Sequence, residues 1–373
     1  MLHVCKSITM VSQQRIFFDF LQFCISSVAH IPASVKDADW QVLYVIAKKQ
    51  ALIGVLFYGI RRLPKELAPE QKLLMQWMVM AEQIRKQNIR LFLDSVKICK
   101  NFENEGFANC ILKGQGNALL YPDPYMRTPG DIDIYLTGGR KRVMQYINKV
   151  CPNQVMRYHH VDFPVMKTAI EVHFTPSYMF YPIYNRRMQK WFEKVMGEQC
   201  NHRVSLPDGY GEIHVPQVSF NVIYILSHLY RHIFTEGIGL RQLLDYYFVL
   251  SMLSVNSEML TSLQKELKFL GLWKFAQAVM FVMKEVFGLS KDRMIVPMDE
   301  REGWFLLDEI MRGGNFGQYD DRMGSKVGES KIHRYFRMNL RNLRFVKHYP
   351  TEAFCEPVFR TWFALWKKIH GIR

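Results

Sequence analysis

The pattern of hydrophobic and polar positions divides the chain into three parts. Residues 1–105 show helical periodicity: positions 40–62 are apolar and periodic, and positions 70–103 contain neither glycine nor proline. Residues 106–216 are mixed, and residues 217–373 are helical again. The pattern therefore predicts an α+β fold, with a small mixed β-sheet core between an N-terminal and a C-terminal helical region.

Short apolar runs alternate with turn residues in the mixed part. They predict strands and helices that are listed here in chain order: strand 108–112, helix 116–120, strand 131–136, helix 140–150, strands 155–165 and 168–174, and strand 212–215. In the C-terminal region, Gly237-Ile238-Gly239 and Gly313-Gly314 interrupt the periodicity, and we expect helices to end there.

Two aspartates stand out in the strand predicted at 131–136. Asp131 and Asp133 are two residues apart, so their side chains should lie on the same strand face. Aspartate is a poor strand former, and two of them among isoleucines need a functional reason. Paired carboxylates are suited to hold a divalent cation such as Mg²⁺ or Mn²⁺. We therefore predict a metal site at these aspartates.

A third carboxylate should come from a neighbouring strand. Glu171 and Asp162 both lie between apolar residues, so both fit this pattern. We favour Glu171, because it shares one strand face with Ala169 and His173 while apolar residues share the other face. Asp162 remains the alternative.

A glycine-bearing turn precedes the aspartates. Its residues are Lys113, Gly114, Gln115, Gly116 and Asn117. Backbone N–H groups of the last three would lie at a helix N-terminus, which favours phosphate, and Lys113 and Arg127 would add positive charge. The turn matches neither the dinucleotide fingerprint nor the P-loop. Next to two metal-binding aspartates, however, it predicts transfer of a nucleotidyl group from an NTP.

These motifs together resemble a known family. They are the Lys-Gly turn at 113–114, Tyr-Pro at 121–122, Arg-x-x-Gly-Asp-x-Asp at 127–133 and Glu-Val-His at 171–173. This arrangement resembles the uncharacterised bacterial nucleotidyltransferase family of the polymerase-beta-like superfamily, and more distantly it is similar to the AbiE-type nucleotidyltransferase toxins. Asp39-Trp40, residues 237–242 with Asp245, and Tyr349-Pro350 extend the resemblance.

The resemblance implies that a mixed sheet carries the metal carboxylates, that an NTP with magnesium is the donor, and that helices close the cleft. It also implies that Arg241 binds phosphate or acceptor. One departure is that Lys113-Gly114-Gln115 replaces the Gly-Ser or Gly-Gly pair of the wider superfamily. Binding of triphosphate at this turn is therefore a weaker expectation than metal binding at the aspartates.

Two histidines, His228 and His232, have the i, i+4 spacing of a helical zinc pair, but the metalloprotease glutamate is absent between them. We expect them to face the cleft or to be hydrogen-bonded within it. Arg241 and Asp245, also four residues apart, have a spacing that allows a salt bridge.

Charge adds information about partners. The net charge is +15, which favours polyanionic partners. Arg334, Arg337, Arg341 and Arg344 should form one face of a C-terminal helix, with apolar residues roughly opposite. This basic stripe is either a solvated outer face or an anion-binding surface. The C-terminal helices as a whole are basic, with ten Lys and Arg against two Glu in residues 331–373, and this favours RNA slightly over a protein hydroxyl or a small molecule as the acceptor.

Cysteine usage and hydropathy suggest the compartment. The seven cysteines include no C-x-x-C pair and are expected to be reduced thiols. No apolar run approaches the roughly 20 residues of a membrane span. The sequence therefore predicts a cytoplasmic enzyme without membrane insertion. Two alternatives to nucleotidyl transfer remain: a metal-dependent glycosyltransferase that uses a nucleotide sugar, and an inactive domain that binds nucleotide or RNA.

Overall fold

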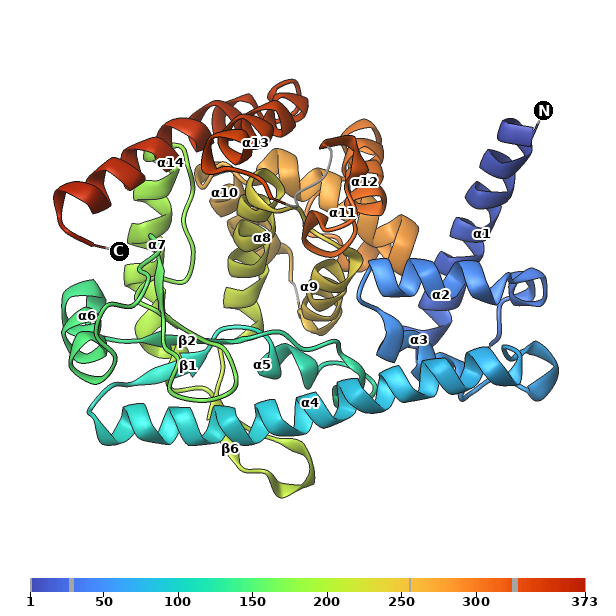
Figure 1. Cartoon of the computed structure of the whole chain (residues 1–373), viewed down its shortest axis with the longest axis horizontal. Helices are drawn as coiled ribbons and strands as arrows, with labels where there is room; N and C mark the ends of the chain where they lie inside the picture. The colour runs from blue at the N-terminus through green and yellow to red at the C-terminus, as the bar shows by residue number, and fades with distance from the viewer. Residues whose placement is uncertain (1, 27–29, 255, 324–327, 373) are drawn as a thin grey trace.

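The computed structural model describes residues 2–26, 30–254, 256–323 and 328–372. Most of the described chain is helical, and a small mixed sheet lies among the helices, as Figure 1 shows. The α+β prediction is therefore confirmed.

Four helices make up the N-terminal region: α1 (Leu2–Ile25), α2 (Trp40–Lys49), α3 (Ile53–Ile60) and α4 (Gln71–Asn104). The apolar stretch predicted at 40–62 forms two helices, because the chain turns at Ala51, which has a φ of 56°. Helix α2 begins after Asp39, whose carboxylate accepts hydrogen bonds from the backbone N–H groups of Gln41 and Val42.

Helix α4 joins two hydrophobic cores. It runs along one edge of the molecule, with α1 to α3 near its first half and the sheet near its second half (Figure 1). Trp77 in the first half is fully buried in the larger core, which the N-terminal and C-terminal helices share. Phe92 and Phe102 in the second half are buried in the smaller core beneath the sheet. The two cores therefore meet along a single helix.

The main sheet contains four short strands: β1 (Asn109–Ile111), β2 (Ile132–Leu136), β3 (His160–Asp162) and β4 (Ile170–His173). Their spatial order is β1-β2-β4-β3, with β2 and β4 parallel and the other two pairs antiparallel. Asp133 pairs with Glu171, and Glu171 pairs with Asp162. Side chains at paired positions lie on the same face, so this register lines up three carboxylates across three strands.

The strand residues that alternate with Asp133 and Glu171 point to the opposite face of this sheet. Ile132, Ile134 and Val172 are fully or almost fully buried in the smaller core. Val143 and Ile147 of helix α6 (Gly139–Val150) belong to the same core. This packing explains why Asp133 and Glu171 turn to the other face.

The remaining mixed segments differ in part from the prediction. Helix α5 (Gln115–Ala118) is a single turn near the helix predicted at 116–120. Strand β6 (Glu212–His214) agrees with the strand predicted at 212–215. Helix α7 (Pro182–Gln199) and strand β5 (Arg203–Ser205), which pairs with β6, were not predicted. Few residues of α7 are buried, so its apolar stripe is narrow.

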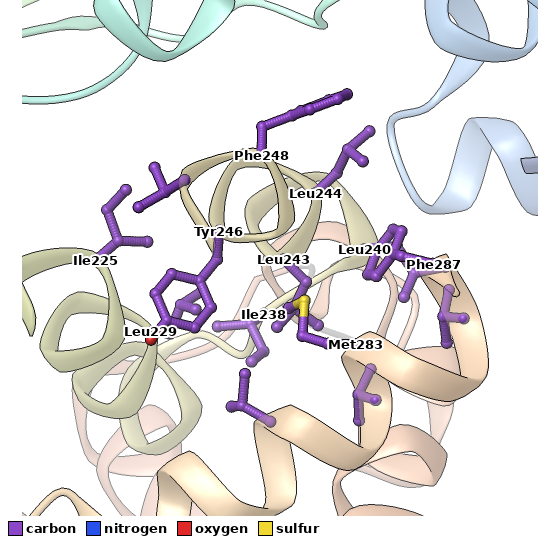
Figure 2. Close-up of a cluster of buried hydrophobic side chains, with 14 of the residues drawn as sticks. Ile225, Leu229, Ile238, Leu240, Leu243, Leu244, Tyr246, Phe248, Met283 and Phe287 are labelled. Carbon is purple, nitrogen blue, oxygen red and sulfur yellow. The ribbon is translucent and has the colours of Figure 1, made fainter. Parts of the chain in front are cut away.

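The C-terminal region is a set of packed helices: α8 (Val218–Thr235), α9 (Leu240–Met252), α10 (Ser257–Phe269), α11 (Trp273–Phe287), α12 (Glu300–Gly313), α13 (Lys331–Val346) and α14 (Pro350–Ile369). Figure 2 shows side chains from α8, α9 and α11 meeting in the larger core, among them Leu229, Leu243 and Met283. As predicted, α8 and α12 end near the glycine pairs at 237–239 and 313–314. Because α9 is almost entirely buried, its polar residues have fixed positions.

The basic stripe of α13 does not form an outer face, which corrects one of our expectations. Arg341 is only 8% exposed, Arg337 forms an ion pair with Glu329, and Arg344 with Asp320. The apolar residues opposite the stripe are the exposed ones: Phe336, Leu340 and Leu343 are each about 60% exposed. Arg337, Arg341 and Arg344 therefore pack inward, whereas Arg334 is exposed, so the four arginines do not form one continuous surface for anions.

Two further expectations concern cysteines and membrane insertion. The six cysteines whose side chains the structure describes are free thiols, and the side chain of Cys5 lies outside the described part. Among the described residues, no helix is both long and apolar enough to cross a bilayer.

Candidate functional site

A cleft of about 530 Å³ lies between the sheet and helices α8 and α9. The turn η6 (Asn315–Gly317) also contributes to its wall. Its lining residues are Lys113, Gly114, Asn117, Arg127, Gly130, Asp131, Asp133, Tyr224, Ile225, His228, Leu229, Arg241, Gln242, Asp245 and Phe316. All but three of the predicted site residues line this cleft. The exceptions are Gln115, Gly116 and Glu171.

The two aspartates lie together in the cleft. Asp133 is on β2 and is 2% exposed, whereas Asp131 precedes the first residue of the strand and is half-buried. The charge of Asp133, together with burial, raises the pKa of Asp131 to about 6. The fold therefore holds two like charges close to each other in a partly buried position.

Two cationic or hydrogen-bonding groups contact Asp133. Lys113 Nζ lies 3.1 Å from Asp133 Oδ1, and His173 Nε2 lies 3.0 Å from the same oxygen. Burial alone would raise the pKa of Asp133, but the Lys113 ammonium and the hydrogen bond from His173 outweigh it and hold this pKa below its usual range. Lys113 also donates a hydrogen bond to His228 Nε2, at 3.2 Å, across the cleft.

Glu171 lies on the neighbouring strand, beside Asp133. Its Oε2 atom is 3.3 Å from His160 Nδ1 and 3.6 Å from His173 Nε2. Burial opposes ionisation, but the hydrogen bond from His173 and the charges of His160 and His173 together outweigh it and lower the pKa of Glu171. Asp162, the alternative third carboxylate, is in register with Glu171 on the far side from Asp133. Glu171 is therefore the nearer of the two to the aspartate pair.

Three overlapping groups in the described part of the chain could hold a metal ion. They are Asp133 with Glu171 and His173, His160 with Asp162 and Glu171, and His159 with His160 and His173. In each group the potential ligand atoms lie within 4.8 Å of one another. Asp131 belongs to none of these groups, although it lines the same cleft as Asp133.

The glycine turn has several local constraints. Gly114 has a φ of 61°, which favours glycine, and it lies next to the backbone of Asp131. Gly116 is needed for packing, because a Cβ there would lie 2.7 Å from Val215. Helix α5 has only four residues, so its dipole is small. Asn117 is 2% exposed and lines the cleft, and its Nδ2 has no hydrogen-bond partner among the described residues.

The two predicted arginines differ in what they contact. Arg127 forms a bidentate ion pair with Asp245, with both N···O distances 2.8 Å, and Tyr121 donates a further hydrogen bond to this carboxylate. Asp245 therefore pairs with Arg127, and not with Arg241 as the i, i+4 spacing allowed. Arg241 Nη1 donates to the carbonyl of Thr128, and its buried Nε has no hydrogen-bond partner among the described residues. Arg241 Nε is therefore a buried donor with the capacity to bind an anionic ligand.

Phe316 and Tyr224 line the cleft and were not predicted. Phe316 has a φ of 53°, unusual for a large residue, and its ring lies 5.5 Å from the Arg241 guanidinium carbon. The Gly-Gly-Asn-Phe-Gly sequence around it was a recognisable signal for a tight turn that presents an aromatic residue. Tyr224 lies in a long buried stretch of α8, where nothing in the sequence distinguishes it from core residues.

Comparison with known families adds a decisive finding. The model of a family described as uncharacterised nucleotidyltransferases matches residues 36–288, more than half of the chain. The chain belongs to this family. The protein is therefore a nucleotidyltransferase, as the sequence motifs predicted. The matched segment includes the cleft carboxylates, Lys113 and Arg241, whereas Phe316 lies beyond it. No curated protein and no solved structure matches the chain.

Proposed function

We propose that this nucleotidyltransferase transfers NMP from an NTP–metal complex to a hydroxyl acceptor, with pyrophosphate as the leaving group. The observation that carries the proposal is the pair of like charges, Asp131 and Asp133, held together in a cleft that also contains hydrogen-bond donors. Folding does not favour such a pair, because the two carboxylates repel each other. A bound cation would stabilise it.

The residues present fit a divalent metal ion. Asp131, Asp133 and Glu171 would hold it, because carboxylate oxygens are preferred ligands of Mg²⁺ and Mn²⁺. We keep Glu171 as the third carboxylate, since β4 pairs directly with β2, whereas Asp162 lies one strand further away. The metal, when bound, would polarise the α-phosphate and neutralise charge on the leaving pyrophosphate.

The donor groups of the cleft suggest where the phosphates bind. Lys113, the turn at Gly114, Asn117 and Arg241 surround the aspartates. Asn117 Nδ2 and Arg241 Nε are buried donors that phosphate oxygens would satisfy. Arg127 was also expected to bind phosphate, but its charge is neutralised by Asp245, so we assign it to holding α9 in place.

In this arrangement the chain binds and orients both reactants. The acceptor hydroxyl attacks the α-phosphorus, the bond from the α-phosphorus to the oxygen that bridges it to the β-phosphorus breaks, and the hydroxyl proton passes to a carboxylate of the cluster. The acceptor can be RNA, a protein hydroxyl or a small molecule. The preference for RNA drew on the basic C-terminal helices, and the inward packing of Arg337 and Arg344 weakens that argument.

The test is transfer of label from each α-labelled NTP, with Mg²⁺ or Mn²⁺, to total RNA, to the protein itself or to small molecules. We expect label on one of these acceptors with the native protein, and none with Asp131→Asn or Asp133→Asn. Asp308→Asn is a matched control, because Asp308 is half-exposed on α12 and pairs only with Arg312 of the same helix. Full transfer by either cleft variant would contradict the proposal. Release of sugar from a nucleotide sugar instead would indicate the glycosyltransferase alternative.

A further inference from the structure

His173 lies close to two of the proposed metal carboxylates, Asp133 and Glu171. Its Nε2 atom is 3.0 Å from Asp133 Oδ1 and 3.6 Å from Glu171 Oε2. The ring is 1% exposed, and its Nδ1 atom has no hydrogen-bond partner among the described residues. All of its polar contacts are therefore on the side of the carboxylates.

These spacings correspond to the edges of a metal coordination sphere. With metal–ligand bonds of roughly 2.1 Å, neighbouring ligands of a tetrahedral or octahedral ion lie roughly 3.0–3.4 Å apart. The distance from His173 Nε2 to Asp133 falls in this range, and the distance to Glu171 lies just above it. The donor atoms of Asp133, Glu171 and His173 all lie within 4.8 Å of one another. A metal ion could contact all three groups with only small side-chain movements.

The sheet fixes these positions. Asp133 and Glu171 are paired across the parallel strands β2 and β4, and His173 is two residues after Glu171 on the same strand face. Ile134 and Val172, on the other face, are fully buried and hold both strands. Ligands on paired strands are held more precisely than ligands on loops.

We propose that His173 Nε2 is a direct ligand of the metal ion held by Asp133 and Glu171, so that the ion is a transition metal such as Mn²⁺ in preference to Mg²⁺. This inference rests on the proposed function. Imidazole nitrogen is a good ligand for transition metals, whereas Mg²⁺ is bound mainly by oxygen. The competing account is that His173 only orients Asp133 through a hydrogen bond.

The experiment is pulsed electron paramagnetic resonance of Mn²⁺ bound to the full chain. A nitrogen in the coordination sphere produces hyperfine modulation of the Mn²⁺ signal, which a hydrogen bond to a carboxylate ligand does not produce to the same extent. We expect this modulation in the native protein and its loss in His173→Gln. Glutamine can still donate a hydrogen bond to Asp133, so this variant preserves the orienting role. His232→Gln is the matched control, because His232 belongs to none of the potential metal groups found in the described residues.

Calorimetric titrations give a second readout that does not depend on turnover. The native protein should bind Mn²⁺ roughly tenfold or more tightly than Mg²⁺, and His173→Gln should lose most of this preference. Circular dichroism would verify that the variant is folded.

The outcomes separate this inference from the function on which it rests. If Mn²⁺ binds and supports transfer but shows no nitrogen modulation, or if the modulation persists in His173→Gln, the ligand assignment is wrong and the proposed function stands. If neither Mn²⁺ nor Mg²⁺ binds in the presence of an NTP, both are wrong.

Discussion

The cleft and the α13–α14 pair are both rich in charged side chains and both contain ion pairs, but the cleft also brings two aspartates together. At the α13–α14 pair, arginines face acids: Arg337 pairs with Glu329, and Arg344 with Asp320. In the cleft, Asp131 and Asp133 both contribute to the lining, and Glu171 is paired with Asp133 on the neighbouring strand. Ion pairs between opposite charges hold helices in place. Like charges held close together repel each other, and a bound cation would reduce this repulsion.

The largest expected effect concerns Asp131. Asp131→Asn should reduce NMP transfer roughly a thousandfold or more, because the loss of a carboxylate contact to the metal is worth several kcal/mol. The same change removes repulsion with Asp133, so the free energy of unfolding should stay the same or rise. Labelled-NTP transfer and urea unfolding measure the two effects. A variant that lost stability along with activity would show that Asp131 is a structural residue.

Arg127 tests whether its ion pair with Asp245 in the cleft wall stabilises the fold, as the ion pairs of α13 do. Arg127→Met leaves Asp245 buried without its cation, and the free energy of unfolding should fall by about 3–5 kcal/mol.

Arg241→Met should instead weaken NTP binding with a smaller loss of stability, since the hydrogen bond that the structure describes for Arg241 is to a backbone carbonyl. Urea unfolding and equilibrium nucleotide binding would compare the two variants. The reverse pattern would return phosphate binding to Arg127.

Glu352 is an exception within the α13–α14 pair and predicts a pH dependence. Its carboxylate accepts hydrogen bonds from the backbone N–H groups of Phe180 and Tyr181, and no ion pair involves it among the described residues. Burial raises the pKa of Glu352 from 4.5 to about 7. Between these values the folded protein binds more protons than the unfolded chain, so the free energy of unfolding should fall as the pH rises through this window, by up to about 3 kcal/mol.

The measurement is urea unfolding at a series of pH values, with Glu352→Gln as the comparison. The neutral amide cannot ionise, so the variant should lose this part of the pH dependence and keep the rest. An identical pH profile for both proteins would mean that Glu352 is ionised at little cost.

The smallest expected effect concerns Arg344. It is partly exposed, with 23% of its side chain accessible, and it pairs with Asp320 at 3.0 Å. Arg344→Met should lower the free energy of unfolding by about 1 kcal/mol and leave NMP transfer unchanged. Thermal unfolding and the labelled-NTP assay would show this. A selective loss of labelling on RNA would instead make the stripe an anion-binding surface after all.

Local patterns in the sequence were sufficient for most elements of the fold. The long uninterrupted stretch at 70–103 became α4, and the alternation around Asp133 and Glu171 gave two neighbouring strands. The alternation also predicted that Asp133 and Glu171 share one face of the sheet, because the residues between them along each strand are apolar and buried. Helix α7 was missed because its buried residues form a narrow stripe between charged ones.

Contacts between distant segments could not be predicted in this way. The spacing of Arg241 and Asp245 indicated a local salt bridge. The carboxylate of Asp245 instead forms its ion pair with Arg127, which is 118 residues earlier in the chain. The arginines of α13 look like an outer face until Asp320 and Glu329 are placed beside them. The sequence shows which side chains can share a face, whereas the charge each one meets depends on how the helices pack.

Phe316 and the aspartates lie in separate stretches of the sequence, which allows them to be substituted independently. The aspartates lie within the segment that defines the family, and the turn that carries Phe316 lies beyond its end. Both reach the same cleft, yet they are encoded in separate stretches of the chain. Under the proposed function, a substitution in the turn would change the wall of the cleft and leave the aspartates unchanged, so it would alter which molecule the cleft accepts without altering the proposed metal site.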